Sequence, residues 1–479
     1  MKKFYITTPI FYPNADLHMG HVYTVTLCDV LARAHRLQGE QTYFLTGADE
    51  NTGKILKIAA EKGQTIPEYL TGITNNFKEL YKKLDISYDQ FIQTSDKEKH
   101  WPGAIALWNK LVEADDIYKS TYTGLYCLSC ETFYTEKDLI DGKCPIHGTV
   151  PERIEEENYF FKLSKYTQPI KEKIQSGELN IVPTTRKNEI LALLDRGLED
   201  ISFSRPIKNV PHGIPVPGDP EQVIYVWCDA LVNYISALGY GRADDELFKT
   251  FWPADVHVVG KDILRFHAAI WPAMLLSAGL PLPKALLVHG LIISGGVKMS
   301  KSIGNVINPY DLINEYGVDA VRYYLTREVS PFEDGDLTIE KFKEAYNANL
   351  ANGLGNLTAR IMKMATTHVK EPVEITKETE SDVSVANHIE HFELNKAMDS
   401  IWERIGHDDA LIAMKKPFSG IKSEEVAIRD EAVLIIKKLV RELYFIASDL
   451  EPFLPETSVK IKSAIKENKM PETLFPRKD

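Results

Sequence analysis

Two strand–helix–strand patterns, far apart in the chain, restrict the possible folds of this sequence more than its other features do. The first consists of KFYITTPI, a helical repeat of apolar residues over 21–37, and QTYFLTG. The second consists of DVHVVG, a helical repeat over 262–277, and KALLVHGLII. Strands joined through a crossover helix are parallel, and such sheets bind ligands at the carboxyl ends of their strands. The sequence therefore predicts an α/β fold with one Rossmann-type, doubly wound parallel sheet built from two separate halves.

The regions between and after these halves differ in residue composition and in the spacing of their apolar residues. Cysteines and an acidic run at Glu155, Glu156 and Glu157 mark the intervening stretch as an insertion. After Asp336, apolar residues recur at helical spacing, with helices expected near 341–365 and 386–405, so an α-helical bundle should close the chain. The expected segments are residues 1–113 and 225–294 for the halves of the α/β domain, 114–224 for the insertion, 295–340 for a linking region and 341–479 for the bundle.

The composition is that of a globular protein, because 44% of the residues are hydrophobic and 26% are charged. No window approaches the length and hydrophobicity of a membrane span, and the N-terminal residues lack the apolar core of a signal peptide. The five cysteines, an odd number, suit reduced thiols. These features predict a cytoplasmic protein without a membrane segment. The net charge of -12 argues against a broadly basic surface but allows a local basic stripe.

The stretch NADLHMGH leads into the first predicted helix and carries two histidines, His18 and His21. Exposed backbone N–H groups and the helix dipole favour anions at a helix N-terminus, and imidazole N–H donors add to this preference. Gly20 leaves room for a flat group to approach the backbone. The pattern indicates phosphate chemistry; the alternative is a pair of surface histidines at a helix entry.

The stretch GGVKMSKS follows the last strand of the second half and places Lys298 and Lys301 three residues apart, after two glycines. Such a loop can clamp the charge of a phosphate transition state, or it can be a solvated surface segment. Its pairing with the histidines on the other half of one nucleotide-binding fold favours the first interpretation. Asp49 ends the second strand, where a carboxylate can hold an ammonium group; the alternative role is a helix N-cap.

Two pairs of residues at knuckle spacing predict a zinc site. Cys127 and Cys130 form the first pair, and Cys144 and His147 form the second. Three thiolates and one imidazole suit tetrahedral Zn2+, and a full set of four ligands indicates a closed, structural site. The alternatives are a redox CxxC motif or a disulfide, neither of which needs the second pair.

Several of these stretches together resemble a known family. HMGH and KMSKS are similar to the two signature sequences of class I aminoacyl-tRNA synthetases. A larger set of stretches resembles the methionyl-tRNA synthetase family over almost the whole chain. These stretches are FYITTPIFYPNADLHMGH, TGADE, GLYCLSC, FYTEKDL, CPIHG, YVWCDAL, GKDILRFH and GVKMSKSIGNV.

The resemblance implies a reaction and a set of residues for it. Methionine and ATP with Mg2+ form methionyl-adenylate and pyrophosphate, and the methionyl group then passes to the terminal adenosine of methionine tRNA, initiator and elongator. In this sequence His18 and His21 would hold phosphate oxygens, Gly20 would admit the adenine, and Asp49 would anchor the ammonium group of methionine. The loop residues expected to contact ATP are Lys298, Met299, Ser300 and Lys301. The residues expected to enclose the methionine side chain are Ile10, Tyr12, Trp227, Ala230, Leu231, Tyr234 and His267.

The resemblance also implies roles in tRNA binding for the C-terminal part of the chain. Residues 295–340 would include a region that contacts the tRNA stem, and the helical bundle would bind the anticodon. The positions that match Asn356 and Arg360 read the CAU anticodon in the family, and Phe418 would stack a base. Asn352, Asn356 and Arg360 are spaced to share a helix face, which can otherwise be a polar, solvated face. A monomer is expected.

Three residues depart from the family pattern: Asn51 where many members have His, Cys228 where they have Phe, and Phe418 where they have Trp. Asn51 bears on the fine geometry of the substrate site, and Cys228 places a thiol beside the pocket. Three other interpretations stay open. These are a class I synthetase for isoleucine or valine, a small-molecule nucleotidyltransferase, and a non-catalytic tRNA-binding relative.

Overall fold

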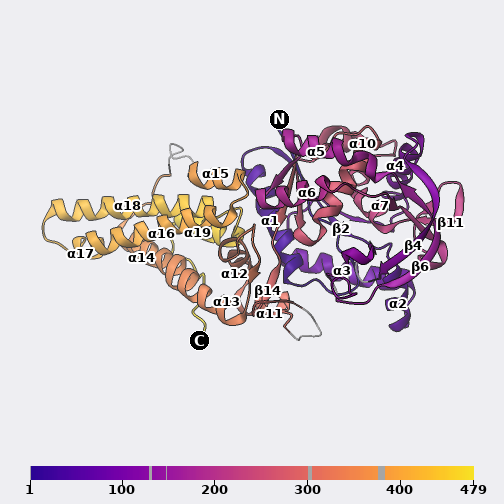
Figure 1. Ribbon diagram of the computed structural model, residues 1–479. Helices are drawn as coiled ribbons and strands as arrows, with labels where there is room; N and C mark the ends of the chain where they lie inside the picture. Colours follow the sequence, from indigo (N-terminus) through magenta and orange to yellow (C-terminus); the bar gives the residue numbers. More distant parts are fainter. Residues whose placement is uncertain (1, 129–131, 147, 300–304, 376–382) are drawn as a thin grey trace. The chain divides into compact units, whose positions relative to one another are not determined.

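The computed structural model describes residues 2–128, 132–146, 148–299, 305–375 and 383–479 (Figure 1). The chain forms two compact units. The first comprises Met1–Leu17 and His35–His289, and the second comprises His18–Ala34 and Gly290–Asp479. Among the described residues, no helix has both the length and the apolar character needed to cross a membrane.

A parallel sheet of six strands forms the centre of the first unit. Its order is β3 (Gln90–Gln93), β2 (Gln41–Ala48), β1 (Lys3–Thr7), β12 (Val256–Gly260), β13 (Ala285–His289) and β7 (Asn180–Val182). Strands from both halves of the chain meet where Ile6 of β1 pairs with Val256 of β12. Strands β12 and β13 are buried at every residue, as expected for a parallel sheet covered on both faces. The predicted doubly wound sheet is confirmed.

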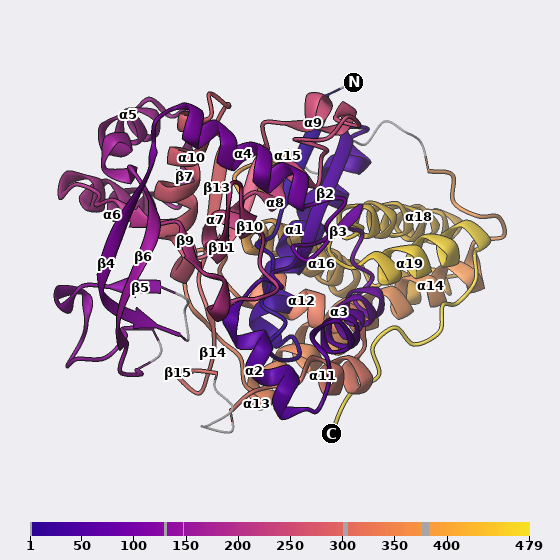
Figure 2. The ribbon, with the colours of Figure 1, turned by 90° about the vertical axis from the view of Figure 1, so that its right-hand side faces the viewer.

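Helices of the first unit alternate along the chain with its strands, and several lie beside this sheet (Figure 2). They are α2 (Gly53–Glu61), α3 (Ile66–Lys83), α4 (Trp101–Glu113), α5 (Thr167–Ser176), α6 (Thr184–Asp195), α7 (Val226–Leu231), α8 (Asn233–Ser236), α9 (Glu246–Phe251) and α10 (Trp271–Ser277). Helix α3 begins at a capping box, in which Thr65 and Glu68 satisfy each other's backbone N–H groups. The helix predicted over 262–277 is divided into a turn at Lys261–Ile263, a π-helical segment η5 (Phe266–Ile270) and α10.

The stretch KALLVHGLII was predicted as one strand, and this prediction is wrong. The stretch forms β13 and a separate strand β14 (Ile292–Ser294), which belongs to another sheet. The break falls at Gly290, where a Cβ atom would lie 2.0 Å from the carbonyl oxygen of Glu333. A neighbouring backbone approaches so closely there that only glycine fits, and the strand pairing changes at this point.

The region between the halves is rich in antiparallel β-structure. One sheet contains β5 (Thr132–Tyr134), β4 (Ile117–Cys127), β6 (Glu152–Phe161) and β8 (Ile201–Ser202). A second contains β10 (Pro215–Val216), β11 (Asp219–Ile224) and β9 (Ser204–Pro206). Strand β7 of the same region joins the edge of the central parallel sheet, a connection that the sequence did not predict.

The second unit contains helix α1 (Met19–Leu37, with its last residues in the first unit), a small sheet and a helical bundle. The sheet has the order β15 (Val297–Lys298), β14, β16 (Gly335–Asp336). The helices after it are α11 (Pro309–Tyr316), α12 (Val318–Tyr323), α13 (Ile339–Ala345), α14 (Asn356–His368), α15 (Val383–Glu390), α16 (Leu394–Lys415), α17 (Pro417–Gly420), α18 (Val426–Asp449) and α19 (Pro455–Glu467) (Figure 1). The predicted helical region is confirmed.

Two details of the bundle differ from the expected continuous helices. The helix predicted over 341–365 contains a π-helical segment, η7 (Tyr346–Gly355), between α13 and α14. The helix predicted over 386–405 is interrupted after α15, where Phe392 has a φ of 61°. Apolar side chains fill the interior as predicted, and Ile436, Leu439 and Leu443 of α18 are fully buried.

Candidate active site

Asp49 lies directly after β2, at the carboxyl end of a central strand. Its backbone N–H donates to the carbonyl oxygen of Phe11 at 3.0 Å, and its side chain is buried. Phe11 and Ala48 form an isolated parallel bridge, so the chain beyond β1 and the chain beyond β2 continue side by side. The N-cap of the next helix is Thr52 rather than Asp49. The alternative role of Asp49 as a helix N-cap is therefore wrong.

A hydrogen-bonded pair of buried side chains, Tyr234 and His267, lies among the aromatic residues of the first unit. The Tyr234 hydroxyl and His267 Nε2 are 2.7 Å apart, and His267 Nδ1 is 3.0 Å from the carbonyl oxygen of Ile263. Because a carbonyl oxygen only accepts, His267 carries its proton on Nδ1, and the hydroxyl donates to Nε2. Burial lowers the pKa of His267 to about 4, so the ring is neutral at physiological pH.

The backbone geometry at His267 is uncommon. This residue lies in the π-helical segment η5, and such segments frequently occur at functional sites because they turn side chains out of the regular helical register. The sequence shows only a helical repeat here, so the π-helical turn was not predicted. The Tyr234 ring in turn stacks on His257 at 4.2 Å between centroids, and the Tyr5 hydroxyl donates to the Tyr234 carbonyl oxygen at 2.7 Å. The position of Tyr234 is thus fixed from several sides.

Trp227 and Phe266 form the closest aromatic stack in this region, with centroids 3.5 Å apart and planes 10° apart. Tyr12 meets the Trp227 ring edge-on at 6.4 Å. The buried indole N–H of Trp227 has no hydrogen-bond partner within the described part of the chain. Ala230 and Leu231 lie on the same helix, α7, and are buried. Tyr12 and Phe266 therefore both contact Trp227, and Phe266 joins these residues without having been predicted.

Ile10 is half-buried and lies against β2. A Cβ atom at Gly47 would come within 2.9 Å of Ile10 Cγ2 and 2.2 Å of the Ile92 carbonyl oxygen. Gly47 is therefore required for the close packing of this wall. The sequence stretch TGADE contains this glycine, but spacing alone gave no signal for its role.

Helix α1 begins at the stretch HMGH, and its two histidines cap its first turn. The Gly20 N–H donates to His18 Nδ1 at 3.0 Å, and the His18 N–H donates to His21 Nδ1 at 3.1 Å. Since both Nδ1 atoms accept, a neutral ring at either position carries its proton on Nε2. Burial, together with the neighbouring His18 ring, holds the pKa of His21 well below its usual value. Imidazole N–H donors at a helix N-terminus form an arrangement that can bind an anion.

Buried contacts within the second unit hold α1 in place. Asp29 of α1 forms an ion pair of 2.7 Å with Arg322 of α12, and both side chains are fully buried. Arg322 also donates to the carbonyl oxygen of Phe453 at 2.7 Å. Nearer the histidines, the Tyr23 hydroxyl donates to the Ser330 carbonyl oxygen at 3.0 Å. The helix that presents His18 and His21 is thus anchored along its length.

The stretch GGVKMSKS begins in a tight hairpin. Strands β14 and β15 are antiparallel, with Ile293 opposite Lys298, and Gly295 and Gly296 take positive φ angles of 64° and 77° at the turn. Only glycine adopts two such conformations readily, which explains the pair of glycines in the sequence. Met299 follows the hairpin and is half-buried. The predicted residues Ser300 and Lys301 lie outside the described residues.

The two described cysteines of the predicted zinc site approach the same residue. Cys127 ends β4, and its Sγ lies 3.5 Å from Thr149 Oγ1. The Cys144 N–H donates to the Thr149 carbonyl oxygen at 2.8 Å, and both cysteine side chains are buried. The other two predicted ligands, Cys130 and His147, lie outside the described residues. Within the part that is described, no group of three or more His, Cys, Asp or Glu side chains is arranged to hold a metal.

The residues expected to read the anticodon lie on the helical bundle. Asn356 is exposed at the first residue of α14, and Arg360, one turn later, pairs with Asp409 of α16. Phe418 of α17 is 46% exposed, so its ring can contact a partner. Asn352 belongs to the π-helical segment η7, so the expected regular α-helical spacing of Asn352, Asn356 and Arg360 is wrong for its first member.

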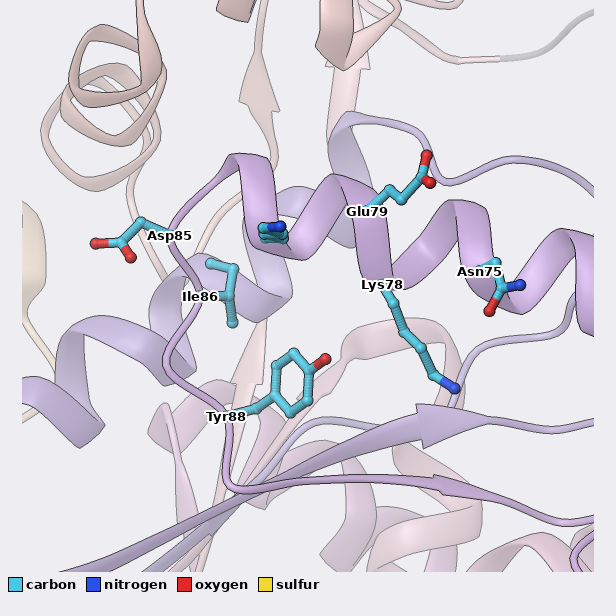
Figure 3. Close-up of a pocket in the computed structure, with 7 residues that line it drawn as sticks. Asn75, Lys78, Glu79, Asp85, Ile86 and Tyr88 are labelled. Carbon is cyan, nitrogen blue, oxygen red and sulfur yellow. The ribbon is translucent and has the colours of Figure 1, made fainter.

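The predicted site residues are divided between the two units. Asp49 and the residues expected around the methionine side chain belong to the first, and the HMGH stretch, the glycine hairpin and the bundle belong to the second. A surface hollow of about 570 Å3 also occurs in the first unit, at the end of α3 (Figure 3). It is lined by Asn75, Lys78, Glu79, Lys82, Asp85, Ile86 and Tyr88. None of these is a predicted site residue, and the mixed charges indicate an ordinary polar surface.

The sequence of this chain is similar to class I tRNA synthetases. The family model described as tRNA synthetases class I (M) matches residues 4–146 and 135–362. The methionine–tRNA ligase of Clostridium acetobutylicum is 45% identical over 97% of this chain and 73% of its own length. That of Thermotoga maritima is 40% identical over 96% of this chain and 74% of its own length.

Solved structures agree with these sequence matches. Mycobacterium tuberculosis methionyl-tRNA synthetase in complex with methionyl-adenylate has a TM-score of 0.91 and 34% identity, covering 100% of this chain and 99% of that one. The apo form of the same enzyme has a TM-score of 0.84, 32% identity and the same coverage. The chain belongs to the methionyl-tRNA synthetase family.

Proposed function

We propose that this chain activates L-methionine with ATP, forming methionyl-adenylate and pyrophosphate, and then transfers the methionyl group to the 3′ end of methionine tRNA, initiator and elongator. The observation that carries this proposal is the family membership over nearly the whole chain. The residues expected around the methionine side chain support the choice of amino acid. They are mostly apolar or aromatic and include a neutral imidazole, so they suit an uncharged, polarizable thioether.

In the first step a methionine carboxylate oxygen attacks the α-phosphorus of ATP, and the bond from that phosphorus to the bridging oxygen of the β-phosphate breaks. Pyrophosphate leaves with the electron pair. No protein nucleophile is needed, so the chain contributes positioning and charge stabilisation. Mg2+ bound to ATP neutralises part of the phosphate charge.

The roles of the phosphate-binding residues follow from their chemistry. His18 and His21 donate from Nε2 to phosphate oxygens, since their Nδ1 atoms accept backbone N–H groups. Lys298 and Lys301, with Met299 and Ser300 between them, contact the triphosphate and stabilise the departing pyrophosphate. Gly20 gives the adenine access to the backbone.

Methionine is recognised at both of its ends. The Asp49 carboxylate accepts a charge-assisted hydrogen bond from the ammonium group of methionine. The side chain lies among Ile10, Tyr12, Trp227, Ala230, Leu231, Tyr234 and His267. Because the Tyr234 hydroxyl already donates to His267, the polar end of the pocket carries no net charge that would repel a thioether.

Cys127, Cys130, Cys144 and His147 bind one structural Zn2+ in this proposal. Its support is that Cys127 and Cys144 are buried and meet at Thr149, although they are separated along the chain. A tetrahedral metal would cross-link the knuckle and stabilise its fold, and it supplies no chemistry to the reaction.

The tRNA is bound by the later segments of the chain. Residues 295–340 contain a contact for the tRNA stem, and 341–479 form the anticodon-binding domain; residues 1–113 and 225–294 are the catalytic halves, and 114–224 is the connective insertion. Asn356 and Arg360 read the anticodon by hydrogen bonds to exposed base edges, and the ring of Phe418 stacks on the face of a base. We further propose a cytoplasmic monomer.

Amino-acid-dependent ATP–pyrophosphate exchange tests the proposal. Methionine is expected to support exchange, while isoleucine and valine at the same concentration are not. Exchange with isoleucine or valine instead would indicate a synthetase for another amino acid. The lack of exchange with all three, in a folded protein that binds methionine tRNA, would indicate a non-catalytic relative.

A further inference from the structure

A buried hydrogen-bond network joins the loop after β2 to helix α7. Its centre is the carboxylate of Asp229, which has no exposed surface. His100 Nε2 lies 2.6 Å from Asp229 Oδ1, and Asn51 Nδ2 lies 2.8 Å from Asp229 Oδ2. His100 and Asn51 are also buried. Three segments far apart in the sequence therefore meet at one carboxylate.

The chemistry of these contacts requires an acceptor at both oxygens of residue 229. The Asn51 NH2 group only donates, so Asp229 Oδ2 accepts from it, and Asp229 Oδ1 offers an acceptor to His100 Nε2. The other ring nitrogen of His100 bonds the Ser236 hydroxyl at 2.8 Å. An asparagine at 229 has the same shape but only one acceptor oxygen, so its NH2 group would face one of the two donors.

The network reaches both sides of the proposed methionine pocket. Asp229 lies on α7 between Trp227 and Ala230, which are pocket residues. On the other side, Asn51 follows Asp49 by two residues in the loop after β2. Asp229 is two residues from Trp227 along α7, and Asn51 is two residues from Asp49 along the loop. A shift of the Asp229 side chain would therefore displace both segments.

The loop is also fixed through Thr94. Asn51 Nδ2 donates to the Thr94 carbonyl oxygen at 2.9 Å, and the Glu50 N–H donates to Thr94 Oγ1 at 2.8 Å. The indole N–H of Trp101 donates to the same carbonyl oxygen at 3.1 Å. Since Asn51 has two acceptors for its NH2 group, it connects Asp229 to the chain beyond β3 as well.

We propose that Asp229 is a positioning residue for methionine recognition: its carboxylate, held by His100 and Asn51, fixes the loop that carries Asp49 relative to the helix that carries Trp227. This inference rests on the proposed function, since it concerns the methionine side of that site. It predicts that disturbing the network weakens methionine binding more than ATP binding. The network also gives Asn51, a departure from the family pattern, a specific partner in this chain.

The test is pyrophosphate exchange with the full chain, in which the KM values for methionine and for ATP are measured separately. Asp229→Asn is expected to raise the KM for methionine about tenfold, because one buried hydrogen bond is lost, while the KM for ATP stays within about twofold. Asn51→Ala is expected to act in the same direction. His100→Gln keeps a donor for Asp229 and should be milder than His100→Ala.

Asp116 offers a matched control in the same unit. Its side chain is also fully buried, and it accepts hydrogen bonds from Ser277 at 2.6 Å and Lys165 at 2.7 Å, but it has no predicted pocket residue among its partners. Asp116→Asn should lower the melting temperature without changing the KM for methionine. If Asp229→Asn does not fold, the KM values for methionine and ATP are compared in Asn51→Ala and His100→Ala instead.

Two results would overturn the inference in a wild-type chain that performs methionine-dependent exchange. One is an equal rise of both KM values in the variants of the network. The other is an unchanged KM for methionine with a loss of melting temperature like that of Asp116→Asn. A wild-type chain without exchange would instead overturn the proposed function itself.

Discussion

Protonation of the buried His267 ring should lower the stability of the folded chain at acid pH. Burial lowers its pKa to about 4, from a usual value of 6.5, while the Tyr234 hydroxyl and the Ile263 carbonyl oxygen occupy its two nitrogens. The folded chain therefore keeps the ring neutral under conditions in which the unfolded chain protonates it. The stability that the neutral ring contributes is fully present above pH 6.5 and is lost as the pH falls towards 4.

The size of the effect follows from the two pKa values. Their difference corresponds to about 3 kcal/mol of unfolding free energy, reached only below pH 4. At pH 5 the unfolded ring is almost fully protonated while the folded ring is mostly neutral. His267 alone should therefore reduce the unfolding free energy by about 2 kcal/mol between pH 7.5 and pH 5.

Urea unfolding of the wild-type chain and of His267→Gln, at both pH values, measures this contribution. Glutamine offers an acceptor to the Tyr234 hydroxyl but does not titrate. Tryptophan fluorescence is a suitable probe, since every tryptophan except Trp402 lies in the first unit. The loss of stability at pH 5 should be smaller in the variant by about 2 kcal/mol. The same loss in both proteins would refute the buried, neutral state of His267.

Three further predictions concern catalysis, metal and tRNA. Lys301→Ala should lower the rate of pyrophosphate exchange about 100-fold or more with little change in the KM for methionine, because it removes a contact to the departing pyrophosphate; a normal rate with weaker methionine binding would contradict its role. The purified chain should contain one zinc per molecule, and chelation should unfold the knuckle while the rest stays folded, as seen by metal analysis and circular dichroism; full activity of a stably folded, metal-free chain would contradict a structural zinc. Arg360→Ala should lower tRNA charging about tenfold or more and leave exchange unchanged, whereas an equal loss in both assays would assign Arg360 to the fold.

The sequence predicted those parts of the fold that depend on local patterns. Strands β1, β2, β12 and β13 are largely buried runs beside helical repeats, and a crossover helix leaves little choice but a parallel pairing. The two glycines before Lys298 predicted a loop, but not that Val297 and Lys298 pair with β14 in a hairpin. Strand β7 was missed because it has three residues, Asn180–Val182, and owes its existence to pairing with β13. The division of β13 from β14 was missed because it depends on the approach of Glu333 to Gly290.

The candidate site divides in the same way. The HMGH stretch, Asp49 and the cysteine pairs carry their chemistry in residue type and spacing, so they could be named in advance. The Asp229 network could not, because its partners His100 and Asn51 lie 129 and 178 positions away and only the fold brings them together. The π-helical turn at His267 was equally invisible, since its sequence fits an ordinary helix.

Charging of methionine tRNA tests the central claim most directly. The purified chain, supplied with radiolabelled methionine, ATP, Mg2+ and methionine tRNA, is expected to form acid-precipitable methionyl-tRNA. A tRNA whose CAU anticodon has been replaced should be charged poorly under the same conditions. Failure of a folded, zinc-containing chain to charge the methionine tRNA, or equal charging of both tRNAs, would contradict this account.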